Sequence, residues 1–216
     1  MYSYIYARTI PEKDDDRNMK SNKDQKKKKP ENEPKTFPQK LVDSLRDIVI
    51  VFAVFLLVYM LLFRVVVVEG SSMNKTLFNG DRLLLLSSSV YQDPKPGDIV
   101  VCSLKDFNDG KCIVKRVIAV EGQKVEVKDN KVYVDDVPLD EPYAVGVTTD
   151  SYDFAITVEP GCVYVLGDNR EYSHDSRGLG RCIDKREILG KVLFLITPGK
   201  ETGNGESDPG RIGVVK

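Results

Sequence analysis

Two residues of this chain have the types and surroundings that covalent catalysis needs, a serine and a lysine. Ser72 lies in the segment GSSMNKTL (70–77), directly after a long apolar stretch. Lys115 lies among apolar residues in IVKRVI (113–118). A serine hydroxyl is a poor nucleophile until a base removes its proton, and a neutral lysine amine is one base that can do so. The pair predicts acyl-transfer chemistry if the fold brings the two side chains together.

Lysine acts as a base only when it is neutral, and its free pKa is about 10.4. Burial lowers that pKa because it disfavours the charged ammonium. In an extended strand, Lys115 shares its face with Ile113 and Val117, while Val114 and Arg116 point to the other face. The apolar neighbours favour a buried amine over a lysine on a solvent-facing side of the strand.

A polar turn, GDNREYSHDSR (167–177), contains the single histidine of the chain, His174. A Ser-His-Asp triad would have to use this residue. His174 sits among several charged side chains, so we expect it to be a solvent-facing turn residue rather than the base.

These residues follow a segment that can cross a membrane. Residues 48–63 carry no charge, and at ~1.5 Å per residue they give about 24 Å of helix. Counting on past Arg64, which can snorkel, to Val68 gives about 31 Å, enough for a bilayer core. The segment is apolar on all sides, which favours a span over a buried core helix. The polar segment before it is too long for a cleaved signal peptide, and no small-x-small site follows.

The flanking charges predict the orientation. Seven Lys or Arg residues lie between 26 and 47 and three between 64 and 85, so the N-terminus should be cytoplasmic and the rest outside. We predict a disordered charged tail over 1–44 and a transmembrane anchor over 45–68. The lysine-rich part of the tail would either lie on anionic lipid or act as a solvated linker. The net charge of -1 gives no sign of nucleic-acid binding.

After the span we predict one β-rich domain over 69–198 and a flexible, Gly-rich tail over 199–216. Phe107–Gly110 and Asp129–Asn130 are the expected hairpin turns. β-branched runs between turn residues predict the strands. These runs are 65–69, 82–87, 98–104, 112–120, 124–127, 131–134, 155–158, 162–166 and 191–197.

The four cysteines would face a compartment in which disulfides persist. Cys102 and Cys112 are equidistant from residue 107, so they could bridge the first hairpin, and Cys162 with Cys182 is a second candidate pair. The alternative is four small buried side chains. Without a close Cys pair, and with one histidine, the sequence predicts no metal site and no cofactor.

Four motifs in this order after a span resemble the type I signal peptidases, the membrane-anchored Ser/Lys proteases that remove signal peptides from exported proteins. The motifs are 70–81, Gly97–Val101, Lys115–Ile118 and 167–177, within a similarity covering about 45–197. The single span resembles the Gram-positive form. The resemblance implies a mainly antiparallel β domain with a Ser/Lys peptidase core, and signal peptides of secretory pre-proteins as substrates. It also implies action in the cell membrane, near the protein-export channel.

The resemblance further implies roles for individual residues. Ser72 would be the nucleophile and Lys115 the general base. Ser173 would hydrogen-bond the Lys115 amine and aim it, and Asp175 with Arg177 would form an ion pair that supports the turn. Shallow apolar pockets would admit small residues at the first and third positions before the cut, the Ala-x-Ala pattern. The pocket residues would be Val66, Val68, Leu77 and Val114.

Two positions bear on this assignment. The resemblance implies that the backbone N–H of Ser72 serves the oxyanion hole. In some members a hydroxyl two residues earlier helps, but that position is Gly70 here, so either a backbone donor suffices or a different group takes part. Lys75 stands where the family usually has proline, which would fix φ and stiffen the segment. That departure is the sole support for a catalytically silent membrane module that only holds signal sequences. A self-cleaving repressor, another Ser/Lys peptidase, is disfavoured by the membrane span.

Overall fold

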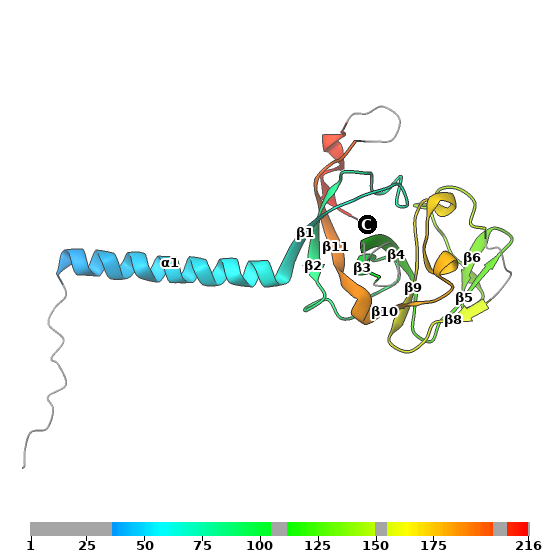
Figure 1. The fold of residues 1–216 in the computed structure, drawn as a ribbon, viewed down its shortest axis with the longest axis horizontal. Coiled ribbons are helices and arrows are strands. Elements are labelled where there is room, and N and C mark those ends of the chain that lie inside the picture. Colours follow the sequence, from blue (N-terminus) through cyan, green and yellow to red (C-terminus); the bar gives the residue numbers. More distant parts are fainter. Residues whose placement is uncertain (1–35, 105–111, 150–154, 201–206, 216) are drawn as a thin grey trace, which may run out of the picture. The chain divides into compact units, whose positions relative to one another are not determined.

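The computed structural model (Figure 1) describes four stretches of the chain, residues 36–104, 112–149, 155–200 and 207–215. The chain divides into two compact units, residues 1–49 and 50–216. The boundary between them falls inside helix α1 (Phe37–Leu62). All of the strands belong to the second unit.

Helix α1 begins at Phe37, so the prediction of a disordered tail is wrong for residues 37–44. Pro38 lies in the first turn of the helix, where its missing N–H removes no intrahelical hydrogen bond. Residues 1–35 of the predicted tail lie outside the described residues.

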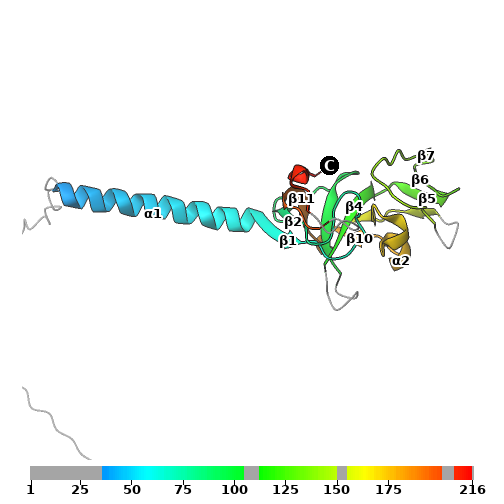
Figure 2. The same ribbon diagram turned by 90° about the horizontal axis from the view of Figure 1, so that it is seen from above.

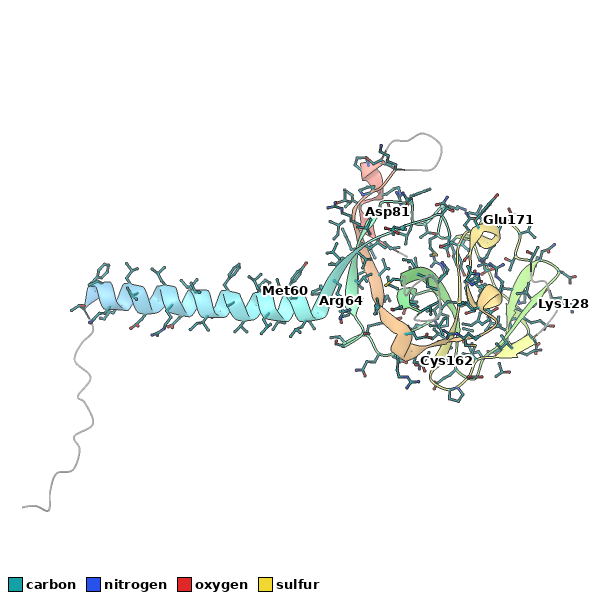
Figure 3. All side chains as sticks on the ribbon, viewed as in Figure 1. Met60, Arg64, Asp81, Lys128, Cys162 and Glu171 are labelled. Atoms are coloured by element: carbon teal, nitrogen blue, oxygen red, sulfur yellow. The ribbon has the colours of Figure 1, made fainter. Side chains whose placement is uncertain are left out.

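None of the residues of α1 is buried, and most, Met60 among them, are exposed (Figure 3). By length and composition, α1 is the one helix within the described stretches that is suited to cross a membrane. The helix ends at Leu62, which corrects the predicted extension of the span to Val68. The next residues form strand β1 (Phe63–Val67) and pair with a neighbouring strand instead of continuing the helix.

The predicted strands are present, with shifts of one to three residues at several ends. After β1 come β2 (Arg82–Ser87), β3 (Ile99–Ser103), β4 (Cys112–Val120), β5 (Lys124–Lys128), β6 (Lys131–Val134), β7 (Val137–Pro138), β8 (Ala155–Thr157), β9 (Cys162–Leu166), β10 (Ile183–Asp184), β11 (Ile188–Thr197) and β12 (Gly213–Val214). Short helical turns lie at η2 (Arg170–Tyr172), α2 (Ser176–Leu179), η3 (Lys185–Glu187) and η4 (Pro209–Arg211).

The strands form two antiparallel sheets, which confirms the predicted mainly β fold (Figures 1 and 2). The larger sheet has the order β1-β2-β11-β3-β4-β9-β10, with β12 paired to β11, and the smaller has the order β7-β6-β5-β8. Asp129 and Asn130 join β5 to β6 with φ values of 51° and 60°, so this predicted hairpin turn is confirmed. The other predicted turn, 107–110, lies outside the described residues.

All four cysteines carry free thiols. Strands β3 and β4 pair Ser103 with Cys112 and Cys102 with Ile113. Side chains of adjacent strand positions point to opposite faces, so Cys102 is buried while Cys112 is exposed. The proposed Cys102–Cys112 bridge fails because the register differs by one residue from a symmetric hairpin.

The predicted flexible tail is ordered where the structure describes it beyond residue 206. Residues 207–215 contain η4 and β12, and β12 pairs with Phe194 and Leu195 of β11. Residues 207–215 thus belong to the folded unit rather than fraying from it.

Candidate active site

Ser72 lies in a closed loop that connects β1 to β2. Val68 N–H donates to the Asp81 carbonyl at 2.9 Å, and Gly80 N–H donates to the Val68 carbonyl at 2.8 Å, which closes the base of the loop. Gly70 has φ +93°, a conformation that side chains strongly disfavour. The loop therefore folds back on itself and presents Ser72 at its turn.

Lys115 meets Ser72 from strand β4. Lys115 Nζ lies 2.7 Å from Ser72 Oγ and 2.9 Å from the Val114 carbonyl oxygen. Only 2% of the lysine is exposed, as its apolar strand neighbours predicted. The structure thus brings together the two residues that the sequence singled out.

Burial lowers the pKa of Lys115 from 10.5 to about 8. The low-dielectric surroundings disfavour the ammonium, and this effect outweighs the opposing attraction of Asp175, Cys102 and Asp168. A substantial fraction of the amine is therefore neutral slightly above neutral pH, which is the form that a general base requires.

The polar turn after β9 is hydrogen-bonded to the backbone of the serine segment. Asn169 N–H donates to the Ser72 carbonyl at 3.0 Å, and its side-chain amide donates to the Ser71 carbonyl at 3.0 Å. A Cβ at Gly167 would overlap Ser173 Oγ and the Ser72 carbonyl oxygen. Asn169 and Gly167 were quoted in the sequence motif, but no role was predicted for either, because their partners lie almost a hundred residues away in the chain.

The predicted ion pair of this turn is present. Arg177 donates to both carboxylate oxygens of Asp175 at 2.9 Å, and Gly167 N–H donates to the same carboxylate at 3.0 Å. Burial would raise the pKa of Asp175, but the bonds and charge of Arg177 hold the pKa below its usual value. The pair fixes the turn that carries Asn169.

Of two other side chains in the turn, Ser173 departs from its predicted contact and His174 lies as expected. The expected bond from Ser173 to the Lys115 amine is not formed, although Ser173 Oγ is buried beside Gly167. His174 is exposed, as expected, and its ring lies close to Gly178 of α2. The hydrogen bond on Ser72 comes from Lys115 rather than from His174.

A buried ion pair that the sequence analysis did not predict links the two halves of the site. Arg116, next to Lys115, donates to both oxygens of Asp168 at 2.9 and 2.7 Å. Thr76 of the serine loop donates its hydroxyl to the same carboxylate at 2.5 Å. Both charged side chains are almost fully buried. Asp168 therefore connects the loop that carries Ser72 to the strand that carries Lys115.

A groove of about 580 Å³ runs beside Ser72 and Lys115. Its lining includes three of the predicted pocket residues, Val66, Val68 and Val114, together with Ser72 and Lys115. Leu77 does not line the groove. It is fully buried in the hydrophobic core with neighbours that include Leu83 and Leu85. The residues that flank Leu77 in the sequence do not distinguish a core position from a groove position.

Lys75, the departure from the family pattern, has φ +82°. Proline cannot adopt this angle because its ring holds φ near −65°. The Lys75 ammonium donates to the Pro142 carbonyl at 2.9 Å and so fastens the serine loop to a neighbouring segment. At position 75 the serine loop is therefore held by a side-chain hydrogen bond rather than by a proline ring.

We expect Lys75→Pro to destabilise the protein by more than about 1 kcal/mol, because the native backbone angle is incompatible with the ring. Thermal melting checks this, with Lys75→Gly as the matched control, since glycine also loses the bond to Pro142 but accepts positive φ. A Lys75→Pro variant that melts with the wild type would contradict the left-handed conformation.

Within the described stretches, no three His, Cys, Asp or Glu side chains gather as a metal site would require.

Comparisons with known proteins point to one family. A profile described as "Signal peptidase, peptidase S26" matches residues 41–197. Signal peptidase I of Bacillus licheniformis is 36% identical over 172 residues, which cover 74% of this chain and 91% of the relative. Probable signal peptidase I-1 of Synechocystis is 37% identical over 160 residues, covering 68% and 80%. A crystal structure of a signal peptidase I from Enterococcus faecalis is 30% identical, covers 46% of this chain and 96% of that one, and has a TM-score of 0.39.

Proposed function

The chain belongs to the signal peptidase family, peptidase S26, and on that premise we propose that it cleaves signal peptides through acyl transfer to Ser72, with Lys115 as the general base. The observation that carries this proposal is the 2.7 Å contact between Lys115 Nζ and Ser72 Oγ at a buried amine. The same contact weighs against the catalytically silent module, whose sole support was Lys75.

In the proposed first step, neutral Lys115 takes the proton of Ser72 as Oγ attacks the carbonyl carbon of the scissile peptide bond. The backbone N–H of Ser72 stabilises the oxyanion. The lysine ammonium then gives its proton to the leaving amine, which becomes the N-terminus of the mature protein. An ester joins Ser72 to the signal peptide, and a water deprotonated by Lys115 hydrolyses it.

Ser173 has a proposed role in the neutral state of the amine. A neutral Lys115 accepts a bond from the Ser72 hydroxyl with its lone pair and keeps two N–H donors. One of them reaches the Val114 carbonyl. A bond between Lys115 and Ser173 is not formed in this structure, so we propose that Ser173 Oγ, which is buried beside Gly167, accepts the other N–H once the amine is neutral. Asp175 and Arg177 then act through the backbone of the turn rather than on the substrate.

The groove supports a substrate bound as an extended strand. β1 ends the strand order of the larger sheet, and among the described strands it pairs with β2 alone, so its other edge is free. A peptide adding to this edge would place alternate side chains against Val66, Val68 and Val114. The substrate side chains that meet these valines would be those at the first and third positions before the cut. Shallow apolar walls there favour small residues, as in the Ala-x-Ala pattern.

The family is membrane-bound, and the apolar α1 fits a membrane anchor. We propose that the N-terminus is cytoplasmic and that the strands lie outside, near the export channel, because lysine and arginine residues gather before α1.

The substrate proposal can be tested with purified protein in detergent and a pre-protein whose cleavage site follows an Ala-x-Ala sequence. We expect Leu in place of Ala at the first position before the cut to slow cleavage by about a hundredfold, since an overfilled pocket displaces the scissile bond. Leu at the second position is the matched control. It should change the rate by no more than about threefold, because that side chain points away from the sheet face. Equal rates for both substrates would refute the pocket assignment.

A further inference from the structure

The C-terminal segment 207–215 reaches back to the loop that carries Ser72. It lies beyond the region that matches the family profile, residues 41–197. Strand β12 fixes the segment to β11, and Val215 N–H donates to the Leu193 carbonyl at 3.3 Å. η4 then holds Arg211 against the end of the serine loop. Figure 3 labels Asp81 next to this segment.

Arg211 grips the loop through a buried carboxylate. Its guanidinium donates to both oxygens of Asp81, at 3.1 and 2.6 Å, and stacks 4.3 Å from the Phe78 ring centre. Asp81 is fully buried and also accepts from Phe78 N–H at 2.8 Å and Gly199 N–H at 2.6 Å. Among the described residues, Arg211 is the cation paired with it. Without Arg211, a buried carboxylate would keep two N–H donors but lose its counter-charge.

The contacts of Asp81 and Arg211 involve residues on both sides of Ser72 in the sequence. Asp81 accepts the Val68 N–H through its backbone carbonyl, four residues before Ser72. Arg211 also donates to the Thr76 carbonyl at 3.3 Å, four residues after Ser72. The Thr76 hydroxyl is in turn bound to Asp168, the partner of the arginine next to Lys115. One guanidinium therefore contacts both the base of the loop and the residue that links the loop to the Lys115 strand.

We infer that Arg211 is a positioning residue that holds the nucleophile loop in register with Lys115. The loop has no proline at position 75 to stiffen it, and bonds to residues distant in sequence hold it instead: Lys75 donates to Pro142, and Asp81 accepts from Arg211. The effect on turnover rests on the proposed function. The immobilisation of residues 74–81 does not depend on it.

Arg211→Ala tests the inference by turnover and by hydrogen exchange. We expect kcat to fall about tenfold with KM within about twofold, because a loosened loop misplaces Ser72 without changing the groove. Amides of 74–81 should exchange at least about tenfold faster, while those of β4 and β9 stay unchanged. Ethylguanidinium in the millimolar range should restore part of kcat by filling the vacated site. Arg186→Ala, which removes an exposed arginine from an ion pair with Asp184, is the matched control and should change neither readout.

Arg211→Lys keeps the positive charge but loses the paired guanidinium hydrogen bonds to Asp81. It is the variant to test if Arg211→Ala does not fold. It should lower kcat about threefold and speed exchange only in 74–81. Wild-type kcat and exchange in either folded variant would overturn the inference. So would faster exchange spread evenly over all strands without rescue, since that pattern reports global instability. If the wild type leaves pre-proteins uncut while 74–81 still loosens in Arg211→Ala, the proposed function fails and the positioning of the loop stands.

Discussion

Ser72→Ala and Lys115→Ala are each expected to lower pre-protein processing by about a thousandfold or more, a loss of about 4 kcal/mol of transition-state stabilisation. In the proposed mechanism, either change removes one of the two groups between which the proton passes, which lie 2.7 Å apart. Because the two residues act as a unit, the double variant should be no slower than the slower single variant. Initial rates under saturating substrate measure all three.

Lys124→Ala is the matched control for the lysine. It also removes a strand lysine, but one on the smaller sheet whose side chain is partly exposed and paired with Asp136. It should keep wild-type turnover. Retained turnover in Lys115→Ala would remove the lysine base from the mechanism.

Loss of folding can be separated from loss of chemistry by Lys115→Met. Because the folded pKa is about 8 and the free value 10.5, the unfolded chain binds more protons between these pH values, so wild-type stability rises with pH across that window. Below pH 8 the protonated lysine costs on the order of 3 kcal/mol. An inactive Lys115→Met protein should therefore be at least as stable as the wild type at pH 7 by thermal melting.

The sequence was sufficient to single out Ser72 and Lys115, which the structure brings into contact, because the features that mark them are local. Lys115 is flanked by apolar strand residues, and alternation along a strand is a property of neighbouring positions. The strand positions followed for the same reason. The end of α1 at Leu62 did not, because Phe63 is as apolar as the helix before it and only its pairing with Leu86 makes it a strand.

Features that depend on distant pairing could not be predicted. Leu77 was assigned to a pocket, but whether an apolar side chain faces a groove or a core depends on which strands cover it. Cys112 lies opposite Ser103 rather than Cys102 because register is set by the whole sheet. Arg211 lay in a Gly-rich tail, and its partner Asp81 is 130 residues away.

The rate of processing should fall as pH is lowered through about 8, and kcat/KM should show this acid limb because it reports the free enzyme. As the proposed base, Lys115 would act only as the neutral amine, and burial sets its pKa below the free value. At pH 6 the neutral fraction is about one hundredth of its plateau, so kcat/KM should be about a hundredfold lower there. Rates measured across pH 5.5–10 in buffers of constant ionic strength would check the prediction.

Two variants of the polar turn determine which group produces the limb. Asp175 raises the pKa of Lys115 through its negative charge, so Asp175→Asn should move the limb to lower pH, provided that melting shows a folded protein. The neighbouring change His174→Ala removes an exposed imidazole and should leave the limb where it is. An acid limb near 6.5, the unperturbed histidine value, that disappears in His174→Ala would replace lysine with histidine as the base. A limb near 8 that persists in His174→Ala and shifts downward in Asp175→Asn is what a buried lysine beside a carboxylate requires.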